Sequence, residues 1–132
     1  MNQTKDTMTD FRQDKAIYLQ MADRICDGIL SGEYRPGDRI PSVRELAVFL
    51  GVNANTVVKS YELLSRQGII QTRRGMGYYV TEDAMAKILD DRRTRFLEET
   101  LPEVFRQMQL LGIPAETLTE KREEWLRSLR TD

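Results

Sequence analysis

The apolar residues between positions 16 and 30 recur at steps of three and four, which is the spacing of one face of an α-helix. They are Ile17, Met21, Ile25, Ile29 and Leu30. We expect this helix to end at Gly32, and the Pro36-Gly37 pair predicts a turn in the loop that follows. The lone cysteine, Cys26, falls within the helical pattern and is interpreted as a small buried side chain rather than a redox sensor.

Two further helices follow in close succession. Ser42 opens the first of them with a capping-box pattern that Glu45 completes, and Gly51 ends it. Its expected buried face consists of Leu46, Ala47, Phe49 and Leu50. Asn53 is a good cap for the next helix, which we expect to run to about Gln67. The core positions of that helix are Val57, Tyr61 and Leu64.

The segments 69–73 and 78–81 are rich in residues that favour β-strands, and they flank a turn with the sequence RGMG. This pattern predicts a two-stranded hairpin with Ile70 and Val80 pointing inward. A lone hairpin is only marginally stable, so this one must pack on the three helices. A helix, a helix-turn-helix and a hairpin in this order predict a winged helix.

A second apolar stripe at helical spacing extends over residues 85–111. Pro102 either kinks this helix or starts a second one, because Thr100 and Glu103 form another capping-box pattern. A final helix is expected over residues 114–129, with Leu118, Trp125, Leu126 and Leu129 on one side.

This tail is too apolar for solvent and too small to form a core of its own. Burial against a second copy of the chain is the simplest arrangement and predicts a homodimer, whereas the alternative folds the tail back onto its own winged helix. The expected dimerisation residues are Met85, Leu89, Phe96, Leu97, Leu101, Phe105, Met108 and Trp125. The predicted fold is therefore mainly α with a small β-hairpin. A disordered segment (1–13) precedes a winged helix-turn-helix domain (14–81), and a two- to three-helix antiparallel dimerisation tail (82–132) follows.

The composition excludes several classes of protein. The 132 residues include one cysteine and no histidine, which excludes zinc sites built from His and Cys and hydrolases with a His-activated nucleophile. Neighbouring carboxylates such as Asp90-Asp91, Glu98-Glu99 and Glu123-Glu124 face different directions on a helix. The sequence therefore predicts no enzyme, no cofactor and no metal. A single cysteine fits a reducing cytosol, and no membrane span or signal peptide is apparent, so we expect a cytoplasmic protein without a membrane partner.

The net charge of −1 is unevenly distributed along the chain. Residues 12–80 carry ten Lys or Arg against seven Asp or Glu, whereas residues 81–132 carry nine against twelve. Between residues 53 and 80, the acidic residue Glu62 stands alone against four basic residues. Positive charge is therefore concentrated where the helix-turn-helix and the hairpin lie, which favours contact with phosphates.

The third helix begins with short polar side chains, as a helix must if its end is to enter the major groove of DNA. Asn55 is suited to bond adenine, and the methyl group of Thr56 is suited to touch thymine. Lys59, one turn later, is placed for a phosphate or a guanine edge. The alternative is that Asn53 merely caps the helix and that Asn55 and Thr56 are ordinary first-turn residues.

Two further places suit DNA phosphates. Arg44 lies beside the capping Ser42, where the free amides of a helix terminus attract anions, although Arg44 could instead pair with a carboxylate. At the hairpin tip, Gly75 and Gly77 permit positive dihedrals and close approach of the backbone. Arg73 and Arg74 bring charge to the same tip.

The chain resembles the amino-terminal domain of GntR-family bacterial regulators over roughly residues 15–81. The motifs that carry the resemblance are PSVRELA at 41–47, VNANTV at 52–57, KSYELL at 59–64 and GII at 68–70 through RGMGYYV at 74–80. The short helical tail further resembles the YtrA subfamily, whose members are typically dimeric repressors, often of transporter operons.

This resemblance implies DNA contacts at Ser42, Arg44, Asn53, Asn55, Thr56, Lys59, Gly75 and Gly77. The chain departs from the family pattern at Ala54 and Val58, where many relatives have arginines. We therefore expect less guanine reading from that turn.

We expect a sequence-specific regulator of transcription, a dimeric repressor that binds an inverted repeat in double-stranded DNA. The alternative is a winged-helix module that binds protein and has no DNA affinity, which predicts an apolar exposed face on the third helix. One chain has little volume for a small-molecule effector, but a dimer seam near Phe96, Phe105 and Trp125 would offer room.

Overall fold

The computed structural model describes residues 16–130, so the segment 1–13 that we expect to be disordered lies outside the described residues. The chain divides into two compact units, one that ends at Asp90 and one that begins at Asp91. None of the helices in the described range is both long and apolar enough to cross a membrane.

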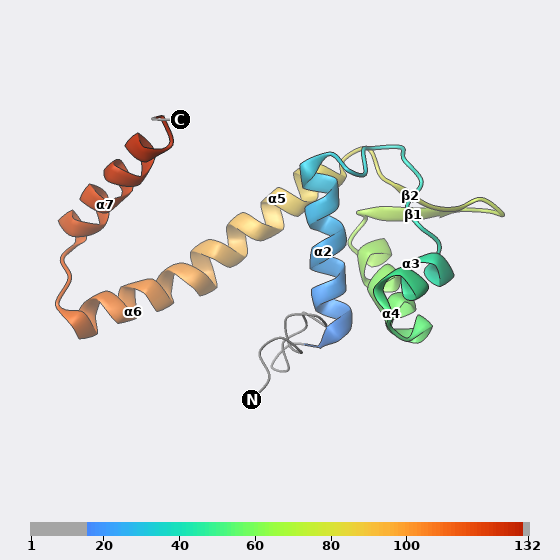
Figure 1. Cartoon of the computed structure of the whole chain (residues 1–132), viewed down its shortest axis with the longest axis horizontal. Helices are drawn as coiled ribbons and strands as arrows, with labels where there is room; N and C mark the ends of the chain where they lie inside the picture. Colours follow the sequence, from blue (N-terminus) through green and yellow to red (C-terminus); the bar gives the residue numbers. More distant parts are fainter. Residues whose placement is uncertain (1–15, 131–132) are drawn as a thin grey trace. The chain divides into compact units, whose positions relative to one another are not determined.

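The first unit is a small helical domain with one antiparallel hairpin (Figure 1). Its elements are α2 (Ile17–Ser31), α3 (Val43–Leu50), α4 (Ala54–Arg66), β1 (Ile70–Arg73), β2 (Gly77–Val80) and the first part of α5 (Ala84–Arg95). The order of these elements confirms the winged helix-turn-helix that the sequence predicts.

The two helices of the helix-turn-helix begin and end at the residues that the sequence singles out. The Ser42 hydroxyl accepts the Glu45 amide, while the Glu45 carboxylate accepts the Ser42 amide, so the capping box of α3 is complete. Gly51 ends α3 in the left-handed region at φ 68°, where glycine carries no steric penalty. The Asn53 side chain then caps α4.

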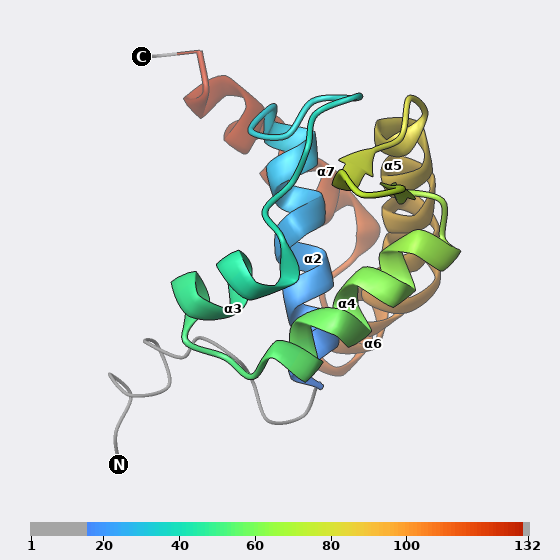
Figure 2. The same cartoon turned by 90° about the vertical axis from the view of Figure 1, so that its right-hand side faces the viewer.

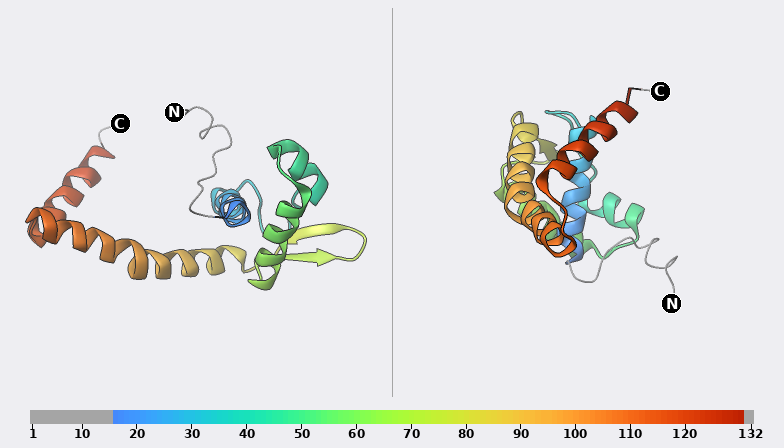
Figure 3. Two further views of the ribbon diagram at one scale, coloured as in Figure 1. Left: turned by 90° about the horizontal axis from the view of Figure 1, so that it is seen from below. Right: turned by 90° about the vertical axis from the view of Figure 1, so that its left-hand side faces the viewer.

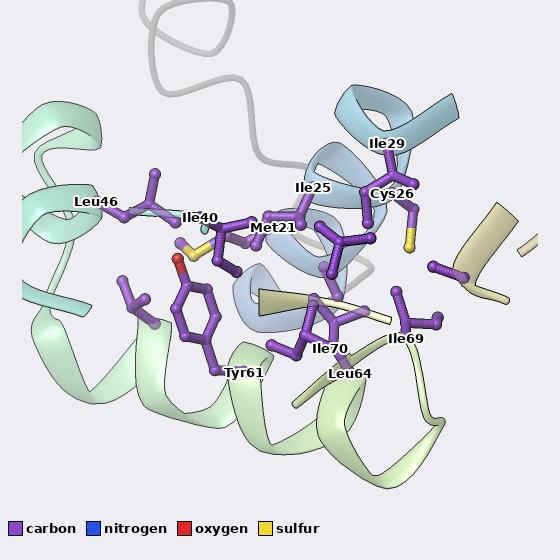
Figure 4. Packing of buried hydrophobic residues seen from close by; sticks show 14 of the residues in the cluster. Met21, Ile25, Cys26, Ile29, Ile40, Leu46, Tyr61, Leu64, Ile69 and Ile70 are labelled. Atoms are coloured by element: carbon purple, nitrogen blue, oxygen red, sulfur yellow. The ribbon is translucent and has the colours of Figure 1, made fainter. Parts of the chain in front are cut away.

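The core lies where α2 and α4 face the hairpin (Figure 4). Its fully buried residues with the largest side chains include Met21, Ile29, Ile40, Tyr61, Leu64 and Ile70. The Tyr61 hydroxyl donates to the Pro41 carbonyl at 2.6 Å, and its ring packs edge-on against Tyr78 with centroids 4.8 Å apart. Burial raises the pKa of Tyr61 above its usual value, so this hydroxyl remains a donor. Cys26 is buried in the same core, as expected.

One expectation about α3 is wrong. Phe49 is 82% exposed instead of buried, whereas Leu46 and Ala47 are buried. The reason is helical geometry: Phe49 lies about 110° around the helix axis from the centre of the face that Leu46, Ala47 and Leu50 share. An apolar side chain on a short helix marks the buried face only when its angular position agrees with the others.

The hairpin has the predicted inward residues. Ile70 pairs directly with Val80, and both are almost completely buried. The turn between the strands closes with a bond from the Met76 amide to the Arg73 carbonyl at 2.8 Å. The tip extends beyond α3 and α4 of the same unit (Figure 3, left), which leaves it open to solvent.

The first unit extends further along the chain than the predicted boundary at residue 82. Ala84 and Ile88 of α5 are buried in its core, so the first turns of this helix belong to the unit that ends at Asp90.

The second unit contains the end of α5, a π-helical turn η1 (Phe96–Thr100), α6 (Leu101–Leu111) and α7 (Ala115–Ser128). No residue of η1, α6 or α7 is buried. The helices α6 and α7 diverge from the loop at 112–114 (Figure 1), so they do not form a core with each other.

The capping box expected at Thr100 and Glu103 is not formed. Thr100 has helical dihedrals and makes no side-chain cap bond, and Glu103 bonds to Arg106 and Gln107. Pro102 lacks an amide and therefore cannot donate to the turn before it. The chain stays helical because the preceding turn widens, with the Leu101 amide donating to the carbonyl of Phe96.

Candidate nucleic-acid interface

The start of α4 presents a polar surface. Asn53 and Asn55 are exposed and Thr56 is half-buried, whereas Val57 and Ser60 on the inner side are fully buried. The outer face of this helix end is therefore available to a large partner.

A buried hydrogen bond fixes the orientation of α4. The Ser60 hydroxyl donates to the Tyr18 carbonyl of α2 at 2.6 Å. This bond and the apolar inner face hold α4 against α2. The polar face of α4 therefore points outward.

Lys59 lies on the same exposed side, one turn after Asn55. Its ammonium nitrogen is 5.9 Å from the centroid of the Tyr18 ring, close enough for a cation–π interaction. This contact orients the side chain and leaves the charge available to a phosphate.

The amino terminus of α3 forms a second polar site. The Ser42 and Glu45 side chains occupy two of the backbone donors, and these hydrogen bonds hold the pKa of the Glu45 carboxyl below its usual value. The amides of Val43 and Arg44 have no partner inside the helix because they belong to its first turn. An anion is favoured beside these amides.

Arg44 is exposed at this terminus. Within residues 16–130 it forms no ion pair, so the carboxylate partner that the sequence left open is not found there. Its guanidinium is free to make a bidentate contact with a phosphate.

A hollow of about 560 Å³ lies between α3 and the start of α4, the two helices of the helix-turn-helix. Arg44 and Val48 of α3 line one side, and Val52 and Ala54 at the start of α4 line the other. Figure 2 looks onto the hairpin tip and shows α3, α4 and the hairpin in front of α2. The structure therefore brings the three predicted contact regions to one side of the first unit.

The hairpin tip has the backbone that the sequence predicts. Gly75 and Gly77 both have positive φ, at 72° and 102°. The guanidinium of Arg73 lies 4.1 Å from the centroid of the Tyr79 ring and is held there by a cation–π contact. Arg74 is exposed at the tip, so both arginines keep their charge at the surface.

Sequence reasoning missed Arg39 and Tyr79. Tyr79 supports Arg73, and the Nε atom of Arg39 donates to the Met76 carbonyl at the tip at 3.1 Å. The sequence predicted a loop with a turn at Pro36-Gly37 before α3 and nothing more about residues 39–41. It gave no sign that they pair with the hairpin, because the contact joins residues 37 positions apart.

The expected dimerisation residues are exposed or half-buried. Phe96, Leu97, Phe105 and Trp125 each expose half or more of their area, and Met85 exposes 39%. Leu89, Leu101 and Met108 are half-buried. Soluble proteins rarely leave so many large apolar side chains in contact with water.

The model of bacterial regulatory proteins of the gntR family matches residues 17–80. The chain is 40% identical over 110 residues to the uncharacterized HTH-type transcriptional regulator YhcF of Bacillus subtilis (strain 168), covering 83% of this chain and 89% of that protein. It is 36% identical over 123 residues to the HTH-type transcriptional repressor YtrA of the same organism, covering 93% of this chain and 91% of that protein.

Solved structures are similar as well. A putative transcriptional regulator of the GntR family from Bacteroides thetaiotaomicron has a TM-score of 0.76 and 45% identity, covering 87% of this chain and all of that chain. YtrA from Sulfolobus acidocaldarius, a GntR-family transcription factor, has a TM-score of 0.52 and 40% identity, covering 65% of this chain and 90% of that chain.

Proposed function

This chain belongs to the GntR family of bacterial regulatory proteins, and we propose that it is a dimeric repressor that binds an inverted-repeat operator. The family consists of DNA-binding regulators of transcription, which are not enzymes, and the chain is a YtrA-like member of it. We also propose that the protein is cytoplasmic and has no membrane partner, as suits a regulator that binds DNA.

The exposed polar end of α4 carries the proposal. Asn55 and Lys59 project from a helix whose inner face is fixed by buried contacts, and the hairpin tip with Arg73 and Arg74 lies on the same side. We expect α4 to enter the major groove while the hairpin tip lies against the neighbouring backbone. The alternative, a protein-binding module, requires an apolar face on α4, whereas the exposed residues of this helix are polar apart from Ala54.

The residues at the start of α4 also suggest what kind of operator is bound. Ala54 is exposed and Val58 is half-buried, and neither can donate to guanine. Small apolar groups favour the methyl group of thymine, and Asn55 favours adenine. We expect an operator whose half-sites are rich in A·T pairs where this turn lies.

The exposed apolar residues of the second unit support the proposal of a dimer. Its helices have no buried residue of their own, and their apolar side chains would lose contact with water against a second copy. Two copies of the first unit related by a twofold axis read two half-sites, which is why the operator should be an inverted repeat.

Repression is proposed from the similarity to the repressor YtrA of Bacillus subtilis. A dimer bound over a promoter would exclude the polymerase from it. The subfamily resemblance further suggests an operon linked to a transporter. A small-molecule effector would find room at the dimer seam near Phe96, Phe105 and Trp125, where aromatic side chains are exposed.

Selection of duplexes from a random pool by the purified full-length chain tests this function. We expect one enriched inverted repeat, and a copy of it upstream of the protein's own gene. A reporter driven by that promoter should become more active when the protein is removed. A pool without enrichment, or with enrichment of a single half-site, would contradict the proposed dimeric operator.

A further inference from the structure

The segment before α3 forms a third strand-like edge on the hairpin. The Ile40 amide donates to the Tyr78 carbonyl at 3.0 Å, and the Val80 amide donates to the Asp38 carbonyl at 2.9 Å. Arg39 and Tyr79 pair directly across this edge. The segment therefore lies along β2 on the side opposite to β1.

This pairing decides where the Arg39 side chain goes. Ile40 is 1% exposed and points into the core, so its neighbour Arg39 points to the outer face of the sheet. Tyr79, which is opposite Arg39, lies on that outer face, as does Arg73 stacked on the Tyr79 ring. The side chains of Arg39, Arg73 and Tyr79 consequently share the outer face of the sheet.

The side chain of Arg39 reaches the turn of the hairpin. Its Nε atom donates to the carbonyl of Met76 at 3.1 Å. A Cβ atom at Gly77 would lie only 3.0 Å from that Nε and 3.6 Å from Nη2, so the glycine leaves room for the guanidinium. Gly77 thus serves a purpose besides its positive φ.

The remaining donors of Arg39 are unused. Within residues 16–130 its Nη groups make no hydrogen bond or ion pair. Arg39 is three residues before Ser42, so the chain keeps it close to the amino terminus of α3, while its Nε atom lies at the turn of the hairpin. Arg39 therefore lies between the two expected phosphate sites.

We propose that Arg39 is both a positioning residue for the hairpin tip and a further DNA-phosphate contact. The Nε atom holds the Met76 carbonyl and so fixes the turn that carries Gly75 and Gly77. The Nη groups donate to a phosphate. This inference rests on the proposed DNA-binding function.

The planar guanidinium suits this double role. Its N–H groups point in fixed directions, so one edge can hold a carbonyl while another binds an anion. Fixing the turn before DNA arrives lowers the entropy lost on binding. A lysine has one ammonium group in place of this fork and cannot hold both partners in the same geometry.

Two substitutions separate the roles. Arg39→Gln places an amide nitrogen where Nε was but removes the charge, whereas Arg39→Ala removes both the donor and the charge. Arg35→Ala is the matched control, because Arg35 is an exposed arginine of the same loop whose side chain makes no contact with the tip within residues 16–130. Both positions are exposed, so the three variants should fold, which circular dichroism would check.

The first measurement is amide hydrogen exchange at Met76 and Gly77 in the full-length protein without DNA. Arg39→Ala should speed exchange at the tip several-fold, while Arg39→Gln and Arg35→Ala should match the wild type. Wild-type exchange in Arg39→Ala would overturn the positioning role.

The second measurement is affinity for a mixed-sequence duplex as a function of salt. Arg39→Gln and Arg39→Ala should each lower the salt slope by about one, and Arg35→Ala should not. Arg39→Ala should bind roughly tenfold more weakly than wild type at moderate salt.

An unchanged slope in Arg39→Gln, or an equal fall in Arg35→Ala, would overturn the phosphate contact. If the wild type itself bound no duplex, the proposed function and the phosphate contact would both fail. The exchange data would still decide the positioning role, so the two failures can be told apart.

Discussion

Asn53 and Asn55 are close neighbours with different roles. The Asn53 oxygen accepts the Asn55 amide at 2.7 Å and is committed to the helix cap. The Asn55 side chain makes no hydrogen bond within residues 16–130, so both its donor and its acceptor are free for an adenine edge. Of the two, Asn55 is therefore the better candidate for reading a base.

Replacing Asn55 by Ala should relax the preference for one base pair in each half-site. A bidentate contact with adenine discriminates by about 1–3 kcal/mol, so roughly tenfold of the preference at that pair should vanish. Binding of operator variants to wild type and mutant would measure this. Asn53→Ala should instead lower stability, and an unchanged ranking of variants in Asn55→Ala would rule out the contact.

We expect Arg44 and Lys59 to bind DNA through their positive charge. Arg44→Ala and Lys59→Ala should each weaken binding to all sequences and lower the slope of affinity against salt by about one. Lys121→Ala on α7 provides a control, because this exposed lysine is outside the expected interface. A slope that stays at the wild-type value would remove the residue concerned from the phosphate contacts.

The capping box of α3 makes stability depend on pH. The pKa of Glu45 is lower in the folded protein, so its contribution is fully present above the unfolded value near 4.5 and is lost as the pH falls through the folded pKa. Glu45→Gln should remove this part of the acid sensitivity, measured as the melting temperature between neutral and acidic pH. Glu62→Gln on α4 is the control, and identical pH profiles for wild type and Glu45→Gln would contradict the assignment.

Much of the helix-turn-helix could be predicted from the sequence, because its caps and turn depend on nearby residues. The caps Ser42 and Asn53 and the turn glycine Gly51 depend on neighbours within a few residues, so the sequence alone identified them. Phe49 and Arg39 depend on which face of a helix or strand is covered by distant parts of the chain. Packing against residues that are distant in the sequence produces no regular pattern along the chain, so the sequence alone does not reveal it.

At the scale of elements, the π turn η1 changes the direction of the apolar side chains that follow it. It holds one residue more than an α turn and rotates later residues back by about 100°. This rotation brings Leu101, Phe105 and Met108 closer in angle to Phe96 and Leu97. The arc of the helix surface that these five residues span narrows from about 180° to about 100°. The sequence could not show this, because residue spacing assumes one uniform helix.

The π turn can be tested by changing the number of residues. Deleting Glu98 should convert the wide turn into an ordinary α turn and leave the stripe in register, so self-association should persist. Inserting one alanine after Glu103 should rotate Phe105 and Met108 out of register and weaken self-association. Sedimentation of both variants measures this, and equal behaviour of the two would contradict the role of the turn.

For the whole molecule, the exposed apolar stripe predicts the oligomeric state. Phe105→Glu should convert the proposed dimer into a monomer, because burial of a charge at the interface is unfavourable. Leu110→Glu is the matched control, since Leu110 is 69% exposed but lies on the opposite side of α6. Analytical ultracentrifugation would measure both, and a Phe105→Glu protein that remained dimeric would exclude this face as the interface.

In the proposed complex, the start of α4 lies in the major groove while the hairpin tip lies against the neighbouring DNA backbone. Nuclear magnetic resonance of the labelled full-length protein, titrated with its selected duplex, tests it most directly. We expect the largest chemical-shift changes on residues 42–44, 53–59 and 73–77, with the side-chain signals of Asn55 among them. Shifts confined to the exposed apolar residues Val48 and Phe49, or to α7, would contradict it.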